Sequence, residues 1–283
     1  MDIGTTLAVE NLDGLEKSCV ALQRLGFRSC QLGSWSSDLW TDKTAVQLSF
    51  YLQKYGLTPS SFWCGYEGPR SWDFYQGPVS LGLLPRQYRE VRVKNLCDGA
   101  DFARKLGITD VITHMGFIPE DPNNPEFLPF CDAVRTVALH LKENGQYLLF
   151  ETGQETPVAL LRCIETVGTD NLGVNLDTAN LILYGKANPV DALDVIGRYV
   201  RGVHAKDGFY PVNGHDLGAE TKIGRGKVDF RAFFTKLHAL GYNSWVTIER
   251  EVPDEEEWAA DVAEAKEYLE NLVHEIDEEA AKC

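Results

Sequence analysis

The chain has 283 residues, of which 44% are hydrophobic and 24% are charged, and its formal net charge is −15. The acidic residues concentrate in 251–283, which holds 13 of them against two lysines. A concentrated basic surface is therefore lacking, which excludes nucleic-acid binding. No Pro/Gly/Ser-rich linker divides the chain, so we expect one domain, 1–283, whose residues 251–283 form an acidic helix packed on the rest.

Neither a leader peptide nor a membrane span is predicted. The first residues lack a basic region followed by an apolar stretch, and no run approaches the ~18 apolar residues of a span. We therefore expect a cytoplasmic protein without membrane contact. The seven cysteines, Cys283 included, form no C-x-x-C pair, so we expect buried free thiols that pack as small hydrophobic residues.

Strands and helices alternate along the chain. Short β-branched or aromatic runs predict eight strands, at 3–9, 29–33, 60–65, 110–115, 147–151, 173–177, 202–205 and 245–249. Helical periodicity lies between them, at 12–25, 46–55, 88–106, 130–143, 157–167, 189–199 and 230–240. Glycine follows most of these helices, as a C-cap does: Gly26, Gly56, Gly107, Gly145, Gly168 and Gly241. The alternation predicts a parallel sheet, and eight units predict a (β/α)₈ TIM barrel.

Two connections are unusually long. Residues 207–228 follow the seventh strand and are rich in glycine, and we expect them to cover the mouth of the barrel. Residues 66–85 follow the third strand and carry Trp72, Phe74 and Tyr75. These aromatic side chains can stack on a sugar or form a packed lid without ligand contact, and the sequence leaves both readings open.

Four metal-ligating residue types stand at the ends of four successive strands: Glu151, Asp177, His204 and Glu249. The carboxyl ends of barrel strands share one mouth, so we expect these side chains to meet. Three carboxylates and one imidazole suit Mn²⁺ or Mg²⁺, with Co²⁺ or Zn²⁺ as alternatives.

The alternative is a structural ion-pair network. Lys206, Arg250 and Arg201 are the cations that would neutralise the carboxylates. Burying three uncompensated carboxylates costs several kcal/mol, which favours the metal interpretation. Lys206 is expected on the opposite side of its strand from His204, where it would orient a ligand from the adjoining turn.

Two further patterns concern ligand binding. His114 ends the fourth strand, where it can hold a substrate hydroxyl or serve as a structural imidazole. The run Gly224-Arg-Gly-Lys227 could bind phosphate through its amides and cations, although it lacks the P-loop spacing. No dinucleotide fingerprint follows the first strand and no serine nucleophile elbow is present.

Several motifs resemble a known family: FETGQET at 150–156, NLDTAN at 175–180, VHAKD at 203–207, IGRGKVDF at 223–230 and TIE at 247–249. The chain resembles the xylose isomerase-like TIM barrels, in particular the sugar (phosphate) isomerase/epimerase group that includes the ketose 3-epimerases. The resemblance implies one divalent ion, usually Mn²⁺, bound by Glu151, Asp177, His204 and Glu249, with the two glutamates also serving as acid and base.

This chain departs from the ketose 3-epimerases at two positions. Asn180 stands where they have a histidine, and Glu155 lies closer to Glu151 than their second, substrate-binding glutamate does to the first. The related endonuclease IV barrels build a three-zinc site from many histidines. This chain has only six histidines and an acidic charge, so we exclude that function.

The expected function is that of a metal-dependent sugar isomerase or epimerase acting by proton transfer next to a carbonyl through an enediolate. The expected partner is a sugar or sugar derivative, with an unphosphorylated one favoured; a homo-oligomer is left open. A lyase or dehydratase acting on a keto-sugar, inosose or 3-keto-glycoside and a non-catalytic sugar-binding barrel are the alternatives. The expected substrate-binding residues are His114, Gln154, Glu155, Asn180, Lys206 and Arg225.

Overall fold

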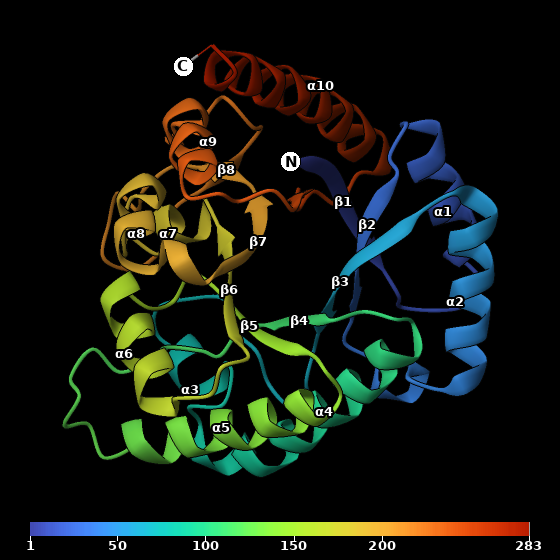
Figure 1. Cartoon of the computed structure of the whole chain (residues 1–283). Helices are drawn as coiled ribbons and strands as arrows, with labels where there is room; N and C mark the ends of the chain where they lie inside the picture. The colour runs from blue at the N-terminus through green and yellow to red at the C-terminus, as the bar shows by residue number, and fades with distance from the viewer. Residues whose placement is uncertain (283) are drawn as a thin grey trace.

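Eight parallel strands close into a barrel in the computed structural model, which describes residues 1–282 (Figure 1). In chain order they are β1 (Asp2–Ala8), β2 (Ser29–Ser34), β3 (Thr58–Cys64), β4 (Asp110–Thr113), β5 (Tyr147–Glu151), β6 (Leu172–Asp177), β7 (Val200–Ala205) and β10 (Trp245–Ile248). Around the barrel their order is β1-β10-β7-β6-β5-β4-β3-β2. The predicted single-domain (β/α)₈ barrel is confirmed.

The longer helices form the outer layer: α1 (Leu15–Arg24), α2 (Asp42–Tyr55), α4 (Arg86–Lys105), α5 (Phe127–Glu143), α6 (Pro157–Val167), α8 (Pro189–Ile196), α9 (Phe230–Ala239) and α10 (Glu255–Ala280). The predicted glycine caps are confirmed. Gly56 and Gly168, which follow α2 and α6, have φ angles of 65° and 68°, a left-handed conformation that strains residues with a Cβ.

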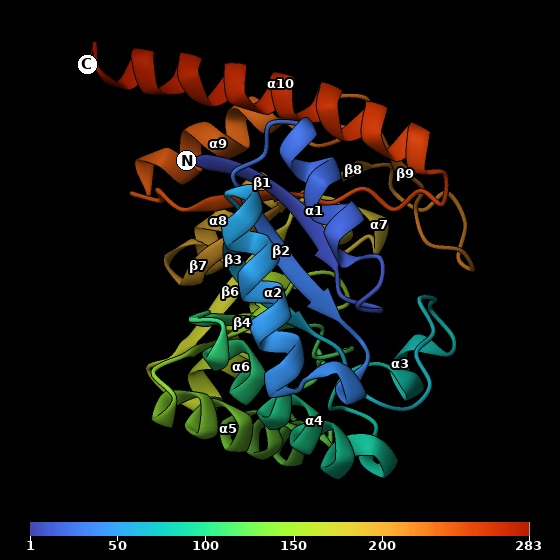
Figure 2. The same cartoon turned by 90° about the vertical axis from the view of Figure 1, so that its right-hand side faces the viewer.

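Several short helices and strands were not predicted from the sequence. The helices α3 (Gly77–Ser80) and α7 (Asn180–Leu183) and the antiparallel pair β8 (Asp207–Gly208) and β9 (Glu220–Thr221) lie within connections. Figure 2 shows them on the side of the barrel toward which the strand arrows point. The helix expected over 189–199 ends at Ile196 and continues as the 3₁₀ turn Gly197–Tyr199, a common tightening at a helix end.

The acidic segment forms α10, which packs against β1, β10 and α9 and crosses the barrel beside the N-terminus (Figure 1). Its buried face includes Val262, Leu269 and Ile276. The side chain of Asp254 caps the helix by accepting the amides of Glu256 and Glu257. Among residues 1–282, no helix combines the length and the apolar character that crossing a membrane requires.

The hydrophobic core fills the barrel and the layer between strands and helices. Most of the cysteines are free and buried in this core, as expected: Cys19, Cys30, Cys64, Cys131 and Cys163. Cys97 is free and half-buried, and Cys283 lies outside the described residues.

Candidate metal centre

The structure brings the four expected ligand residues together. Each leaves a different strand at its carboxyl end: Glu151 from β5, Asp177 from β6, His204 from β7 and Glu249 directly after β10. One ligand atom from each lies within 4.8 Å of all the others. The first three residues are fully buried, while the side chain of Glu249 is 18% exposed toward the mouth of the barrel.

His204 lies at the centre of the cluster. Its Nδ1 is 3.0 Å from Oε1 of Glu151, 3.2 Å from Oε2 of Glu249 and 3.7 Å from Oδ2 of Asp177. Three carboxylates thus converge on one imidazole nitrogen. An oxygen-rich set with one nitrogen is typical of sites for hard divalent cations.

One carboxylate oxygen of the cluster has no hydrogen-bond partner. Oδ1 of Asp177 accepts the amides of Ala179 at 2.8 Å and Asn180 at 2.7 Å, which orients the carboxylate. Oδ2 of Asp177 is buried and accepts nothing, although it faces His204. A buried anionic oxygen without a partner is costly, and coordination of a cation removes that cost. The residues present therefore fit a divalent ion.

The charges inside the cluster shift its pKa values. Burial alone would lower the pKa of His204, but Glu151 and Glu249 outweigh it and raise that pKa well above its usual range. Burial raises the pKa of Asp177 to about 7. Without an ion, the cluster thus holds protons that reduce its excess of negative charge.

The proposed ion-pair network does not form around these carboxylates. Of its three cations, only Lys206 reaches one, with Nζ 3.4 Å from Oε2 of Glu249 and 2.7 Å from Oε2 of Glu251. Arg250 instead pairs with Glu220 and Asp261. Arg201 pairs with Asp110 at the opposite end of the barrel.

Lys206 lies on the same side of the chain as His204. Both side chains approach Oε2 of Glu249, at 3.4 Å and 3.2 Å. The expectation that they face opposite sides is wrong, because residues two apart on an extended strand share a face. Burial disfavours the charge on Lys206, but Glu249 and Glu251 outweigh it and raise its pKa well above the usual range.

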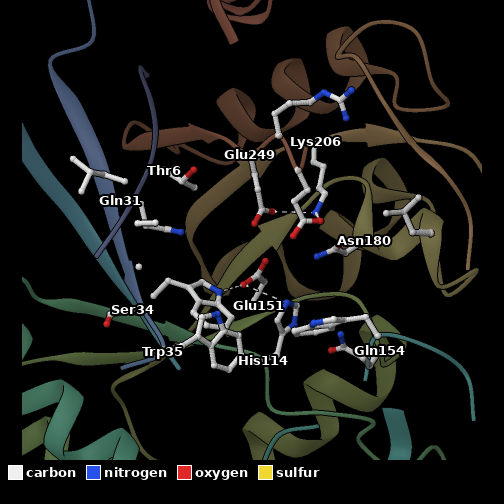
Figure 3. Close-up of a pocket in the computed structure, with 18 of the residues that line it drawn as sticks. Thr6, Gln31, Ser34, Trp35, His114, Glu151, Gln154, Asn180, Lys206 and Glu249 are labelled. Atoms are coloured by element: carbon white, nitrogen blue, oxygen red, sulfur yellow. Dashed lines mark hydrogen bonds and ion pairs between the residues drawn. The ribbon is translucent and has the colours of Figure 1, made fainter. Parts of the chain in front are cut away.

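A cavity of about 430 Å³ opens beside the cluster, and four of the expected substrate-binding residues line it: His114, Gln154, Asn180 and Lys206 (Figure 3). Glu155 and Arg225 are not among the lining residues. Glu155 is buried behind the cavity wall, and burial raises its pKa to about 8. The side chain of Arg225 is 68% exposed and lies 3.5 Å from Glu264.

The glycine-rich run after β7 already holds an anion from its own chain. The carboxylate of Asp207 accepts the amides of Gly208, Gly224, Gly226 and Val228, at 2.8–3.1 Å. A Cβ added to Gly226 would meet this carboxylate at 2.2 Å. The amides of Gly224 and Gly226, which could have bound a phosphate, are therefore occupied by a buried side chain.

Sequence reasoning missed several residues of the site. Trp63 donates its indole N–H to Oε2 of Glu151, the oxygen that also lies 3.5 Å from the predicted His114. Gln31 accepts a hydrogen bond from Nε2 of His204 at 3.0 Å. Strand alternation places such side chains inside the barrel, but it does not show which distant residue each one meets.

The two long connections meet above the cavity. Trp72 and Leu217 line it from 66–85 and 207–228 respectively. Outside it, the Tyr75 hydroxyl lies 2.5 Å from Nδ1 of His215, and the two rings stack. The expectation that 207–228 covers the mouth is thus confirmed. Of the expected aromatic residues, Trp72 reaches the cavity while Tyr75 joins the two connections.

Comparisons with solved structures show the same architecture. A xylose isomerase domain protein from Planctomyces limnophilus is 32% identical, covers 100% of this chain and 99% of its own, and superposes with a TM-score of 0.90. An L-ribulose 3-epimerase is 20% identical over 99% of this chain and 97% of its own, with a TM-score of 0.76. A xylose isomerase-like protein from Mycobacterium smegmatis in complex with magnesium is 18% identical over 97% of each chain, with a TM-score of 0.73.

Two further relatives are each 27% identical to this chain over part of its length. An uncharacterized protein of Methanocaldococcus jannaschii is 27% identical over 72% of this chain and 69% of its own. An inosose dehydratase of Geobacillus kaustophilus is 27% identical over 53% of this chain and 54% of its own. The family model described as xylose isomerase-like TIM barrel matches residues 19–272. The chain belongs to the xylose isomerase-like TIM barrel family.

Proposed function

We propose that the protein is a divalent-metal-dependent sugar isomerase or epimerase that moves a proton next to a carbonyl. One observation carries this proposal: Glu151 and Glu249 approach the same atom, Nδ1 of His204, from two sides of the barrel mouth. Their strands, β5 and β10, are separated in the barrel by β6 and β7. Figure 3 shows the carboxylate ends of Glu151 and Glu249 close together and pointing toward each other.

Glu151, Asp177, His204 and Glu249 would hold the ion, with Mn²⁺ expected and Mg²⁺, Co²⁺ or Zn²⁺ as alternatives. Such an ion supplies Lewis acidity that polarises a carbonyl oxygen and stabilises an enediolate. Asp177 is held rigidly by two backbone amides, so its role is that of a ligand. The two glutamates are left for proton transfer.

Each glutamate is kept ionised by His204 together with one further neighbour. Burial would raise the pKa of Glu151, but His114 and His204 outweigh it and lower that pKa. Burial would also raise the pKa of Glu249, but Lys206 and His204 outweigh it and lower that pKa well below the usual range. With a carboxylate on each side of a carbon, one can remove the proton from one face, and the other, after taking a proton from solvent, can deliver it to the opposite face, which inverts that carbon. One carboxylate working alone would move the proton between adjacent carbons.

The lining of the cavity favours an uncharged polyhydroxylated substrate. His114, Gln154 and Asn180 offer polar groups, and Trp35, Trp63 and Trp72 offer ring faces. The charge of Lys206 is already engaged by Glu249 and Glu251. A phosphate would therefore meet acidic neighbours without a free cation, so we propose an unphosphorylated sugar or sugar derivative.

A metal-dependent dehydratase is the second candidate, supported by the similarity to an inosose dehydratase. The same base would remove the proton next to the carbonyl, and the neighbouring hydroxyl would leave as water. The two candidates predict different products, because only the dehydratase forms an unsaturated ketone or its diketone tautomer.

Both are tested by incubating the Mn²⁺-loaded protein in D₂O with a panel of free ketoses, their phosphates and inososes. We expect deuterium at the carbon beside the carbonyl and a product of unchanged composition. A product lighter by one water would establish the dehydratase instead. Absence of exchange with every member of the panel would contradict the proposed function.

A further inference from the structure

The amide of Gln31 touches the metal centre from across the barrel. Gln31 lies in β2, which is separated from β7 by β1 and β10 in the closed barrel. It is 2% exposed, and its Oε1 lies 3.0 Å from Nε2 of His204. This contact joins residues 173 positions apart in the chain.

The same oxygen accepts a second hydrogen bond. Ser61, the neighbour of Gln31 in the β2–β3 register, donates its hydroxyl to Oε1 at 3.0 Å. The amide oxygen is thus turned toward two donors, while Figure 3 shows the amide nitrogen of Gln31 pointing toward the middle of the cavity. Ser61 therefore holds the oxygen end of the amide toward His204.

The orientation of this amide decides which nitrogen of His204 can bind an ion. A neutral imidazole carries one N–H, and an acceptor at Nε2 keeps the proton there. Nδ1 then presents its lone pair to the space between Glu151, Asp177 and Glu249. A reversed amide would place an N–H donor against Nε2 and require the proton on Nδ1, in the centre of the ligand set.

On the basis of the proposed function, we propose that Gln31 is a positioning residue of the metal centre. Its amide oxygen fixes the tautomer and the ring orientation of His204. An amide suits this place because it accepts a hydrogen bond without adding charge. Three carboxylates already surround the ion site. Loss of such a partner of a metal-ligating histidine typically costs 10–100-fold in metal affinity.

The test is Mn²⁺ titration of chelator-stripped protein, with free Mn²⁺ followed by electron paramagnetic resonance. Gln31→Met keeps the length and loses the acceptor, and we expect it to weaken binding by ~10–100-fold. Gln31→Glu keeps an acceptor at the same place and adds a negative charge, so we expect it to bind Mn²⁺ at least as tightly as the wild-type protein. Ser61→Ala leaves the amide free to turn, and we expect a smaller loss than in Gln31→Met.

Gln146→Met is the matched control. Gln146 is also 2% exposed, but its Nε2 donates to the carbonyls of Ala100 and Ile108 at the amino-terminal end of the barrel. We expect this variant to be less stable than wild type in urea and to bind Mn²⁺ with wild-type affinity. The free energy of unfolding, measured for each metal-free variant, shows whether a substitution has lowered stability as well as metal affinity.

Wild-type affinity in Gln31→Met would overturn the inference, and so would an equal loss in Gln146→Met or Gln31→Glu. If Gln31→Met does not fold, Ser61→Ala decides, and wild-type affinity in that variant overturns the inference. A wild-type protein that binds no Mn²⁺ would instead contradict the proposed function. The two failures are therefore distinguishable.

Discussion

The two ends of the barrel handle charged side chains in opposite ways. At the amino-terminal end of β7, Arg201 lies 2.6 Å from Asp110 and its guanidinium stacks over the Tyr147 ring at 3.5 Å. At the carboxyl end of β7, Lys206 and His204 face several carboxylates. One end is balanced by its own side chains, and the other has an excess of negative charge that a cation can offset. The unbalanced end is where we propose that the reaction takes place.

The largest effect expected from this difference concerns catalysis. Glu151→Gln and Glu249→Gln should each reduce turnover by ~10²–10⁴-fold, because an amide can still bind an ion but cannot carry the proton. Asp110→Asn makes the corresponding change at the balanced end and should leave turnover unchanged. Solvent deuterium exchange measures all three. Exchange near the wild-type rate in either glutamine variant would remove that glutamate from the acid/base role.

A buried carboxyl outside the cavity gives a pH-dependent test. The pKa of Glu155 is raised by burial to about 8, so the stability it contributes is complete below 4.5 and is lost as the pH rises through about 8. Relative to wild type, Glu155→Gln should therefore gain on the order of 4 kcal/mol of unfolding free energy between about pH 5 and about pH 9.

Urea unfolding of metal-free protein across this pH range measures the gain. Glu267→Gln, at an exposed position of α10, is the control and should show no gain. A pH profile of Glu155→Gln parallel to that of wild type would mean that Glu155 is ionised in the folded protein.

Added metal should stabilise the protein only by binding at the carboxyl end of the barrel. Mn²⁺ at 100 times its dissociation constant should raise the unfolding free energy by about 2.7 kcal/mol. Asp177→Asn should lose most of this gain, because the oxygen without a partner no longer carries a negative charge. Asp110→Asn should keep it. A melting temperature of wild-type protein that Mn²⁺ leaves unchanged would contradict the metal site.

The smallest effect is expected at Arg225. Its side chain is exposed, and the neighbouring amides donate to the Asp207 carboxylate. Arg225→Ala should therefore change the free energy of unfolding by no more than about 0.5 kcal/mol and leave KM near the wild-type value. Matched free and phosphorylated ketoses provide the assay. A preference for the phosphorylated sugar that disappears in Arg225→Ala would show that this loop binds phosphate in solution.

Local patterns along the chain were sufficient to predict the barrel and the four side chains that meet at its mouth. Strand and helix periodicities are set by neighbouring residues, and glycine at a helix end reflects the left-handed conformation needed there, as at Gly56 and Gly168. Because parallel strands point the same way, residues at their carboxyl ends had to meet once the barrel was inferred. That is why Glu151 and His204 could be placed together without coordinates.

Contacts between distant strands depended on the closed barrel. The pairing of Gln31 with His204 follows from the diameter and stagger of the strands, which no local pattern encodes. The course of a long connection decided the rest: it brings the Asp207 carboxylate into the glycine turn and leaves Arg225 outside the cavity. Strand direction and residue type indicate which groups line up at the barrel mouth, whereas the contacts that each group makes follow from the path of the chain in three dimensions.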